Sequence, residues 1–260
     1  MLRAMAWDPA QYLKFAGERL QPAIDLLSRI PATAPKTVID VGCGAGNMMP
    51  LLAARWPGAL LAGVDGSPEM LARARKDHPA ARFVEADLNH WRTDAPADVL
   101  FSNAALHWLD HHASLFPSLL KQLAPGGWLA IQMPRNFDAP SHSTVVDTIN
   151  NGPWRDTLMP VLRPRPVAPP DEYWRLLSPL AASVAIWEIE YLQVLKGENP
   201  VAEFTKGSWL PQFLTRLEEP LRSQFESDYR ARVLAAYPKE ADGRTLFRFR
   251  RLFILAQAKA

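Results

Sequence analysis

One stretch of this 260-residue chain decides its fold: Val38-Ile39-Asp40-Val41-Gly42-Cys43-Gly44-Ala45-Gly46-Asn47. Its apolar start predicts a buried strand, and its three glycines predict a tight turn that leads into a helix. Alternate glycines let a ligand approach the backbone closely, and the free N–H groups of the helix then face that ligand. The spacing is G-x-G-x-G with no Lys-Ser/Thr pair, which matches neither the dinucleotide fingerprint nor the phosphate loop. The turn therefore favours an adenosine ligand without phosphates, of which S-adenosylmethionine (SAM) is the common one.

The next three expected strands each end close to a polar side chain that can complete such a site. These side chains are Asp65, Asp87 and Asn103. An acid at the tip of the second strand is placed to accept hydrogen bonds from both ribose hydroxyls, as in dinucleotide folds. Asp87 and its neighbour Leu88 are expected to frame the adenine, while Asp40 and the glycine turn meet the methionine portion. The cofactor-binding candidates are therefore Asp40, Gly42, Gly44, Gly46, Asp65, Asp87, Leu88 and Asn103.

Strand and helix patterns alternate over residues 37–133, which predicts a parallel sheet with helices on both faces. The expected strands are 37–41, 60–64, 81–84, 98–102 and 127–133, and the expected helices are 46–55, 68–77 and 112–122. An amphipathic helix is expected before them over 9–29, kinked or split at Pro22. The alternation stops after Pro134, where helices are expected at 141–150, 171–178 and within 199–238, and strands at 184–195 and 244–258.

The order of these strand-end signals resembles that of the class I SAM-dependent methyltransferases. The resemblance implies an α/β fold with a Rossmann-like, doubly wound, seven-stranded and mostly parallel sheet, whose last strand is antiparallel between the fifth and sixth. Segments 134–183 and 196–243 then become a helical cap over the carboxyl ends of the strands. We expect an N-terminal helical segment (1–36), a SAM-binding core (37–133) and a region with the remaining strands and substrate-cap insertions (134–260), which forms one composite domain with the core.

Composition narrows the possible partners. The net charge of +2, from 29 Lys and Arg against 27 Asp and Glu, gives no global field that would recruit nucleic acid or a membrane surface. No apolar run reaches the roughly 20 residues of a membrane span, and the N-terminus shows no apolar core of a secretory signal. The single cysteine, Cys43, excludes an internal disulfide framework and suits a reducing cytosol. Inside the glycine turn it is expected to be a buried filler rather than a catalytic thiol.

A histidine-rich stretch follows the fourth expected strand: Leu106-His107-Trp108-Leu109-Asp110-His111-His112. Adjacent histidines on a turn seldom converge on one ion without further ligands, and no Cys or Glu lies close in sequence. We therefore expect no metal here, but surface histidines before a helix that Asp110 caps.

The segments outside the core supply cations and aromatic side chains that suit a polycarboxylate substrate. The substrate-binding candidates among them are Arg135, Asn136, Lys206, Trp209 and Arg251. Any one of these cations is more often a solvated surface charge, and we expect two or three of the set to line a pocket. Near the N-terminus, Tyr12 and Arg19 are expected to close over the methionine portion of SAM, with Arg19 as a partner for its carboxylate.

Several longer stretches resemble the trans-aconitate 2-methyltransferase family: Trp7-Asp8-Pro9-Ala10-Gln11-Tyr12-Leu13-Lys14-Phe15-Ala16-Gly17-Glu18-Arg19, Asn103-Ala104-Ala105-Leu106-His107-Trp108-Leu109, Gln132-Met133-Pro134 and Arg251-Leu252-Phe253-Ile254. The similarity spans nearly the whole chain and is looser over 154–200. It implies methyl transfer from SAM to one carboxylate of trans-aconitate, giving a monomethyl ester and S-adenosylhomocysteine, without a metal, in the cytoplasm. Trp108 is then a substrate contact, and His107, where the family commonly has Gln, is a catalytic candidate together with Arg135.

Two alternatives stay open at this point. The acceptor can instead be a malonyl thioester carrier or a hydroxylated small molecule. His107 would donate to a carboxylate acceptor or serve as the base for a different nucleophile, such as a hydroxyl group. The chain can also be a SAM-binding module without catalysis. A nucleic-acid acceptor is not expected because the chain lacks a basic excess. The expected state is a monomer or a weak homodimer.

Overall fold

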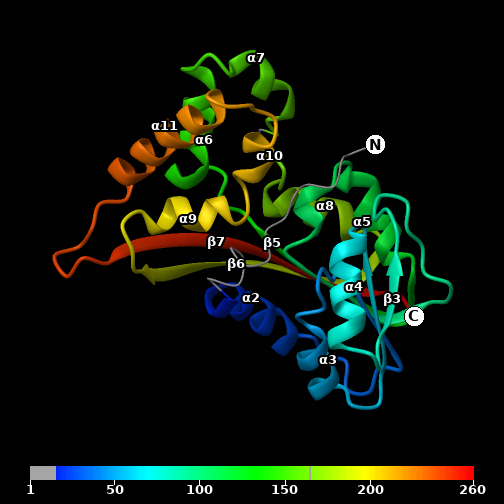
Figure 1. Ribbon diagram of the computed structural model, residues 1–260. Helices are drawn as coiled ribbons and strands as arrows, with labels where there is room; N and C mark the ends of the chain where they lie inside the picture. Colours follow the sequence, from blue (N-terminus) through cyan, green and yellow to red (C-terminus); the bar gives the residue numbers. More distant parts are fainter. Residues whose placement is uncertain (1–15, 164) are drawn as a thin grey trace. The chain divides into compact units, whose positions relative to one another are not determined.

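A computed structural model describes residues 16–163 and 165–260, with side chains described from Leu20 onward (Figure 1). Seven strands form one sheet in the order β3-β2-β1-β4-β5-β7-β6. The strands are β1 (Thr37–Val41), β2 (Leu60–Asp65), β3 (Arg82–Glu85), β4 (Ala97–Asn103), β5 (Leu123–Pro134), β6 (Ala181–Leu195) and β7 (Thr245–Ala258). Strands β1 to β5 pair in parallel, and β7 runs antiparallel to β5. The predicted α/β fold with seven strands is therefore confirmed, including the antiparallel strand between the fifth and the sixth.

The described helices and 3₁₀ turns connect these strands. They are α2 (Ala16–Ser28), α3 (Met49–Arg55), α4 (Pro68–Asp77), η1 (Leu106–Trp108), α5 (His112–Leu120), α6 (Pro140–Asn150), α7 (Arg155–Leu158), η2 (Met159–Val161), α8 (Pro170–Leu177), α9 (Pro200–Lys206), α10 (Pro211–Leu214) and α11 (Leu221–Ala236). Proline stands in the first turn of six of the α-helices. Its missing N–H costs nothing there, because that N–H has no intrahelical partner. Helix α2 continues through Pro22, so the expected split does not occur.

The chain separates into two compact units. The sheet unit is made of Leu20–Pro134, Pro166–Ile189 and Arg251–Ala260, and the helical unit is made of Arg135–Arg165, Glu190–Arg250 and the described residues before Leu20. In the sheet unit, α4 packs against β2 and β3, and α5 packs against β5 and α8 (Figure 1). In the helical unit, α11 packs against α6 and α9. Among the described helices, none is both long and apolar enough to cross a membrane.

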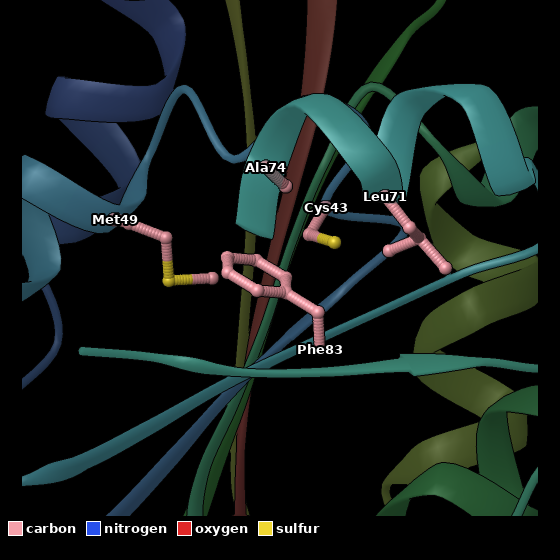
Figure 2. Packing of buried hydrophobic residues seen from close by; sticks show 5 residues of the cluster. All are labelled: Cys43, Met49, Leu71, Ala74 and Phe83. Carbon is pink, nitrogen blue, oxygen red and sulfur yellow. The ribbon is translucent and has the colours of Figure 1, made fainter. Parts of the chain in front are cut away.

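A small apolar cluster lies beside the glycine turn (Figure 2). Its members are Cys43, Met49, Leu71, Ala74 and Phe83, from the turn, α3, α4 and β3. The Cys43 thiol packs so closely on β2 that a Cβ added at Gly63 would lie 2.7 Å from its sulfur. Burial, and then the charges of Asp40 and Asp65, raise the pKa of this thiol far above its ordinary value. Cys43 is thus a protonated core residue, as predicted, because a thiolate is the nucleophilic form.

Candidate functional site

The turn after β1 needs its three glycines. Their φ angles are +80° at Gly42, +53° at Gly44 and +79° at Gly46, in the left-handed region where a side chain is strained. A Cβ at Gly42 would overlap the Cβ of Ala105, and a Cβ at Gly46 would lie 2.8 Å from the His78 ring. No atom of the described residues lies within 4 Å of a Cβ added at Gly44, however. The turn is therefore packed at both ends and open in the middle, where a ligand can reach the backbone.

Asp65, the last residue of β2, is bonded to this turn. One of its carboxylate oxygens accepts a hydrogen bond from the Gly44 N–H (2.8 Å), and the other accepts one from the Ser67 N–H (2.9 Å). Ser67 in turn caps α4. A carboxylate has about four acceptor positions, so Asp65 still has capacity for two hydroxyl groups.

Asp40 lies inside β1 and is only 2% exposed. Burial, and secondarily the negative charge of Asp65, raise its pKa to about 8. A carboxyl group with this pKa is mostly protonated at neutral pH. Asp40 is therefore mostly neutral beside the glycine turn, and a cation bound nearby would favour its ionised form.

Asp87 and Leu88 follow β3 and behave differently from each other. The Asp87 carboxylate is exposed, and hydrogen bonds from the Asn89 backbone N–H (3.0 Å) and side-chain amide (2.8 Å) lower its pKa. Leu88 is buried, and a Cβ added at Gly42 would lie 3.6 Å from its Cδ1. Leu88 thus lies beside the glycine turn.

The loop after β4 carries further candidates. Asn103 ends β4, and its buried Oδ1 has no hydrogen-bond partner in the described structure. The 3₁₀ turn η1 then holds His107, which is 5% exposed, and the ring centroids of His107 and Trp108 are 4.7 Å apart. Strand β4 neighbours β1, so these residues follow a strand end next to the one that carries the glycine turn.

The prediction for the histidine-rich stretch is wrong in two respects. The N-cap of α5 is His111, in a left-handed conformation with φ of 57°, and not Asp110. The histidines are also not all on the surface, because His107 is buried and His112 uses both ring nitrogens. These bond to the Tyr173 hydroxyl (2.7 Å) and the Leu106 carbonyl (2.9 Å). Over residues 16–163 and 165–260, no three His, Cys, Asp or Glu side chains lie grouped as metal ligands would.

In the helical unit, the residues just after β5 bind the backbone of β7. The Arg135 N–H donates to the Arg250 carbonyl (2.9 Å), and the Asn136 side-chain oxygen accepts from the Arg250 N–H (3.1 Å). The other end of the Asn136 amide donates to Ser141 Oγ (3.3 Å). Asn136 is therefore already engaged within its own unit, and the Arg135 side chain is half-buried.

The other predicted substrate residues lie in different surroundings. Lys206 pairs with Glu226 of α11 at 2.6 Å. Trp209 is buried in an aromatic cluster, 5.2 Å from the Phe137 ring and 5.5 Å from the His142 ring.

Arg251 is buried in the sheet unit, where it faces Pro134 across the β5–β7 ladder. Tyr12 and the Arg19 side chain lie outside the described residues.

Sequence reasoning gave no role to Gln132 of β5. This side chain is fully buried, and neither polar atom of its amide group has a hydrogen-bond partner in the described part of the chain. The available signal was a single polar residue inside the apolar run Leu129-Ala130-Ile131-Gln132-Met133.

Solved structures share this fold at low sequence identity. A phosphoethanolamine N-methyltransferase 2 of Haemonchus contortus, in complex with S-adenosyl-L-methionine, aligns with a TM-score of 0.59 at 16% identity and covers 96% of this chain and 56% of that one. The YcgJ protein of Bacillus subtilis aligns with a TM-score of 0.58 at 14% identity, over 92% of this chain and 99% of that one. These similarities concern the fold alone.

Sequence comparisons are more specific. A family model described as a methyltransferase domain matches residues 12–168. A trans-aconitate 2-methyltransferase of Azoarcus sp. (strain BH72) is 44% identical over 250 residues, which are 96% of this chain and 98% of the relative. The enzyme of the same name from Methylobacterium nodulans is 44% identical over 252 residues, with the same coverage. The chain therefore belongs to the trans-aconitate 2-methyltransferase family.

Proposed function

We propose that this protein transfers the methyl group of SAM to one carboxylate of trans-aconitate, giving a monomethyl ester and S-adenosylhomocysteine. The observation that carries the proposal is the 44% identity, over nearly the full length of both chains, with relatives that bear this enzyme name. The open glycine turn beside an available carboxylate supports SAM as the donor. The substrate is therefore a small molecule, and neither nucleic acid nor a membrane is required.

The proposed reaction needs no general base. SAM supplies an electrophilic methyl group on a positively charged sulfur. A carboxylic acid with a pKa near ~4 is already ionised at neutral pH, so its oxygen is a nucleophile without help. The work left to the protein is to hold that oxygen in line with the methyl group and to keep water out.

The roles of the cofactor residues follow from their chemistry. Asp65 accepts hydrogen bonds from the ribose hydroxyls, and Asp87 and Leu88 frame the adenine. Asp40 and the glycine turn meet the methionine portion. The remaining proposed contacts are Asn103, at the end of β4, and Tyr12 and Arg19 near the N-terminus.

For the substrate, His107 and Arg135 are the proposed catalytic contacts, since both can donate hydrogen bonds to a carboxylate. Arg251 offers a planar guanidinium that matches a carboxylate with two parallel bonds. Trp108 and Trp209 supply apolar walls. Asn136 and Lys206 have partners already, so their proposed roles require an exchange of partners. As a working environment we propose the cytoplasm, with a monomer or weak homodimer as the active form.

The test is methyl transfer from labelled SAM to trans-aconitate, with cis-aconitate, isocitrate and citrate assayed in parallel. Selective labelling of trans-aconitate is the expected result. If SAM binds but none of the four acids is labelled, the substrate assignment fails and the search moves to acceptors that His107 can deprotonate. If no acceptor of any class turns over, the protein is a binding module.

A further inference from the structure

Two amide side chains lie next to each other at the carboxyl ends of β4 and β5. Asn103 and Gln132 are register partners in this parallel pair, so their side chains point to the same face of the sheet. Both belong to the sheet unit. The Gln132 side chain is fully buried, and its Nε2 and Oε1 have no hydrogen-bond partners within residues 16–163 and 165–260. The Asn103 Oδ1 is likewise buried without a partner among these residues.

The row continues across the sheet as aromatic side chains. Phe253 of β7 faces Gln132 in the antiparallel ladder, and Trp187 of β6 stacks on Phe253 with ring centroids 5.2 Å apart and planes 6° from parallel. The Trp187 indole nitrogen is also buried, and no described residue bonds to it. Four neighbouring strands thus present two amides and two stacked rings on one face, and three of these four side chains carry a buried polar atom without a partner among the described residues.

Buried polar groups without hydrogen-bond partners destabilise the fold unless a ligand bonds to them. A buried polar group without a hydrogen bond loses its water and gains nothing in return. Elsewhere in the same unit, Gln122 shows how this fold satisfies a buried glutamine. Its Oε1 accepts from the Thr93 N–H (2.7 Å), and its Nε2 donates to the Ser118 carbonyl (3.1 Å). Gln132 lacks any such arrangement, so its amide is kept for something other than folding.

The position of Gln132 indicates which ligand this is. The glycine turn follows β1 and the predicted ribose-binding Asp65 ends β2, whereas β5 lies on the other side of β1, beyond β4. Two strand spacings, or about 10 Å, separate β1 from β5. A donor that reaches from β2 to β1 therefore directs its reactive end toward β4 and β5. The amide row lies on the acceptor side.

We propose that Gln132 is a substrate-binding residue whose amide donates hydrogen bonds to a carboxylate of the acceptor, while Asn103 beside it keeps its proposed contact with the cofactor. This inference rests on the proposed function. It adds an uncharged hydrogen-bond donor for the substrate carboxylate to the cations considered above. An amide provides two N–H donors without a buried charge. The acceptor loses negative charge as its carboxylate becomes an ester, so the bond is at least as strong in the ground state as in the transition state. Its loss should therefore raise KM and leave kcat nearly unchanged.

The experiment compares Gln132→Met with a matched variant, Gln122→Met, in the full chain. Methionine has a similar volume and no amide. The readouts are KM and kcat for trans-aconitate, Kd for SAM by calorimetry, and Tm without ligands. For Gln132→Met we expect KM to rise about 10- to 100-fold, with kcat and the SAM Kd within about twofold. Its Tm should rise by about 3 °C, because an unsatisfied group is removed. Gln122→Met should lower Tm by a similar amount, because its amide is bonded, and leave KM unchanged.

Each outcome decides between distinct statements. A lower Tm with unchanged KM in Gln132→Met would make Gln132 a structural residue and overturn the inference. A weaker SAM Kd with unchanged KM would assign the amide to the donor and overturn it as well. If Gln132→Met does not fold, Gln132→Asn, which shortens the amide arm by one methylene, must show the same rise in KM without a change in kcat. A wild-type protein without activity on trans-aconitate would instead refute the proposed function.

Discussion

The pH dependence of stability should be dominated by Asp40 in the unliganded protein. Its pKa is raised from 3.8 to about 8, mainly because the carboxyl group is buried and secondarily because Asp65 is close. The folded chain therefore binds this proton more tightly than the unfolded chain does. The resulting stabilisation is fully present below the unfolded pKa of 3.8 and is lost as pH rises through the folded pKa of about 8.

The size of the effect follows from the shift. One pKa unit corresponds to about 1.4 kcal/mol, so a shift of about 4 units corresponds to roughly 6 kcal/mol over the full range. Between about pH 5.5 and pH 8, where the protein can be handled, the loss is about 3 kcal/mol. Replacing Asp40 with asparagine keeps the shape of the side chain and removes the titration. The variant should therefore lack this part of the pH dependence.

The assay is urea unfolding of the wild type and of Asp40→Asn at several pH values across that window. The quantity of interest is the difference between their free energies of unfolding, because other titrating groups cancel in it. This difference should change by about 3 kcal/mol in favour of the variant as pH rises to about 8. Asp87→Asn is the control, since an exposed carboxylate with a lowered pKa is already ionised throughout the window. Parallel curves for wild type and Asp40→Asn would refute the reasoning.

Four further predictions concern the ligands and the glycine turn. Binding of SAM at pH 7 should release up to about 0.9 proton from Asp40, as measured by calorimetry in buffers of different ionisation enthalpy. S-adenosylhomocysteine lacks the sulfonium charge and should release fewer protons. Equal release by the two ligands would exclude a role of that charge. Gly42→Ala should destabilise the fold by at least about 2 kcal/mol in chemical unfolding, because it adds overlap to left-handed strain. Gly44→Ala should cost only about 1 kcal/mol but weaken SAM binding at least about tenfold, and an unchanged Kd would remove the turn from the site. Arg135→Ala should raise the acceptor KM about 10- to 100-fold without changing the SAM Kd. The control Arg248→Ala breaks only an exposed pair with Glu190 and should change neither value. Equal losses of acceptor and SAM binding in Arg135→Ala would contradict the assignment of Arg135 to the acceptor.

The sheet could be predicted from sequence because its signals are local. The strand β1 was expected at 37–41 and the helix α4 at 68–77, and both have these bounds. In each case a short apolar run or a capping Ser-Pro pair fixes the element without reference to distant residues. The glycine turn could be predicted for the same reason, because mainly glycine adopts left-handed φ angles without strain. Longer strands are underestimated: β5 begins at Leu123, whereas the expected strand begins at residue 127.

The histidine-rich stretch shows where local reasoning fails. Aspartate is a common N-cap, so Asp110 was the natural expectation before a helix. The cap is His111 instead, and the ring of the next histidine is held by Tyr173, which is 61 residues away in sequence on α8. Packing of α5 against α8 thus decides where the helix begins. No periodicity or capping preference within residues 106–112 contains that information.

Polar residues differ in how strongly their presence in a sequence indicates a functional site. Lys206 attracted attention as a cation in a predicted cap, yet it pairs with Glu226 on a neighbouring helix. A surface cation costs the fold almost nothing, so its presence in a sequence says little about function. Sequence analysis assigned no role to Gln132. Burying its unpaired amide inside an apolar strand costs free energy, however, because the amide loses its hydrogen bonds to water. A polar residue that interrupts a buried strand near its carboxyl end is therefore a stronger indication of a binding site than a charge in an insertion.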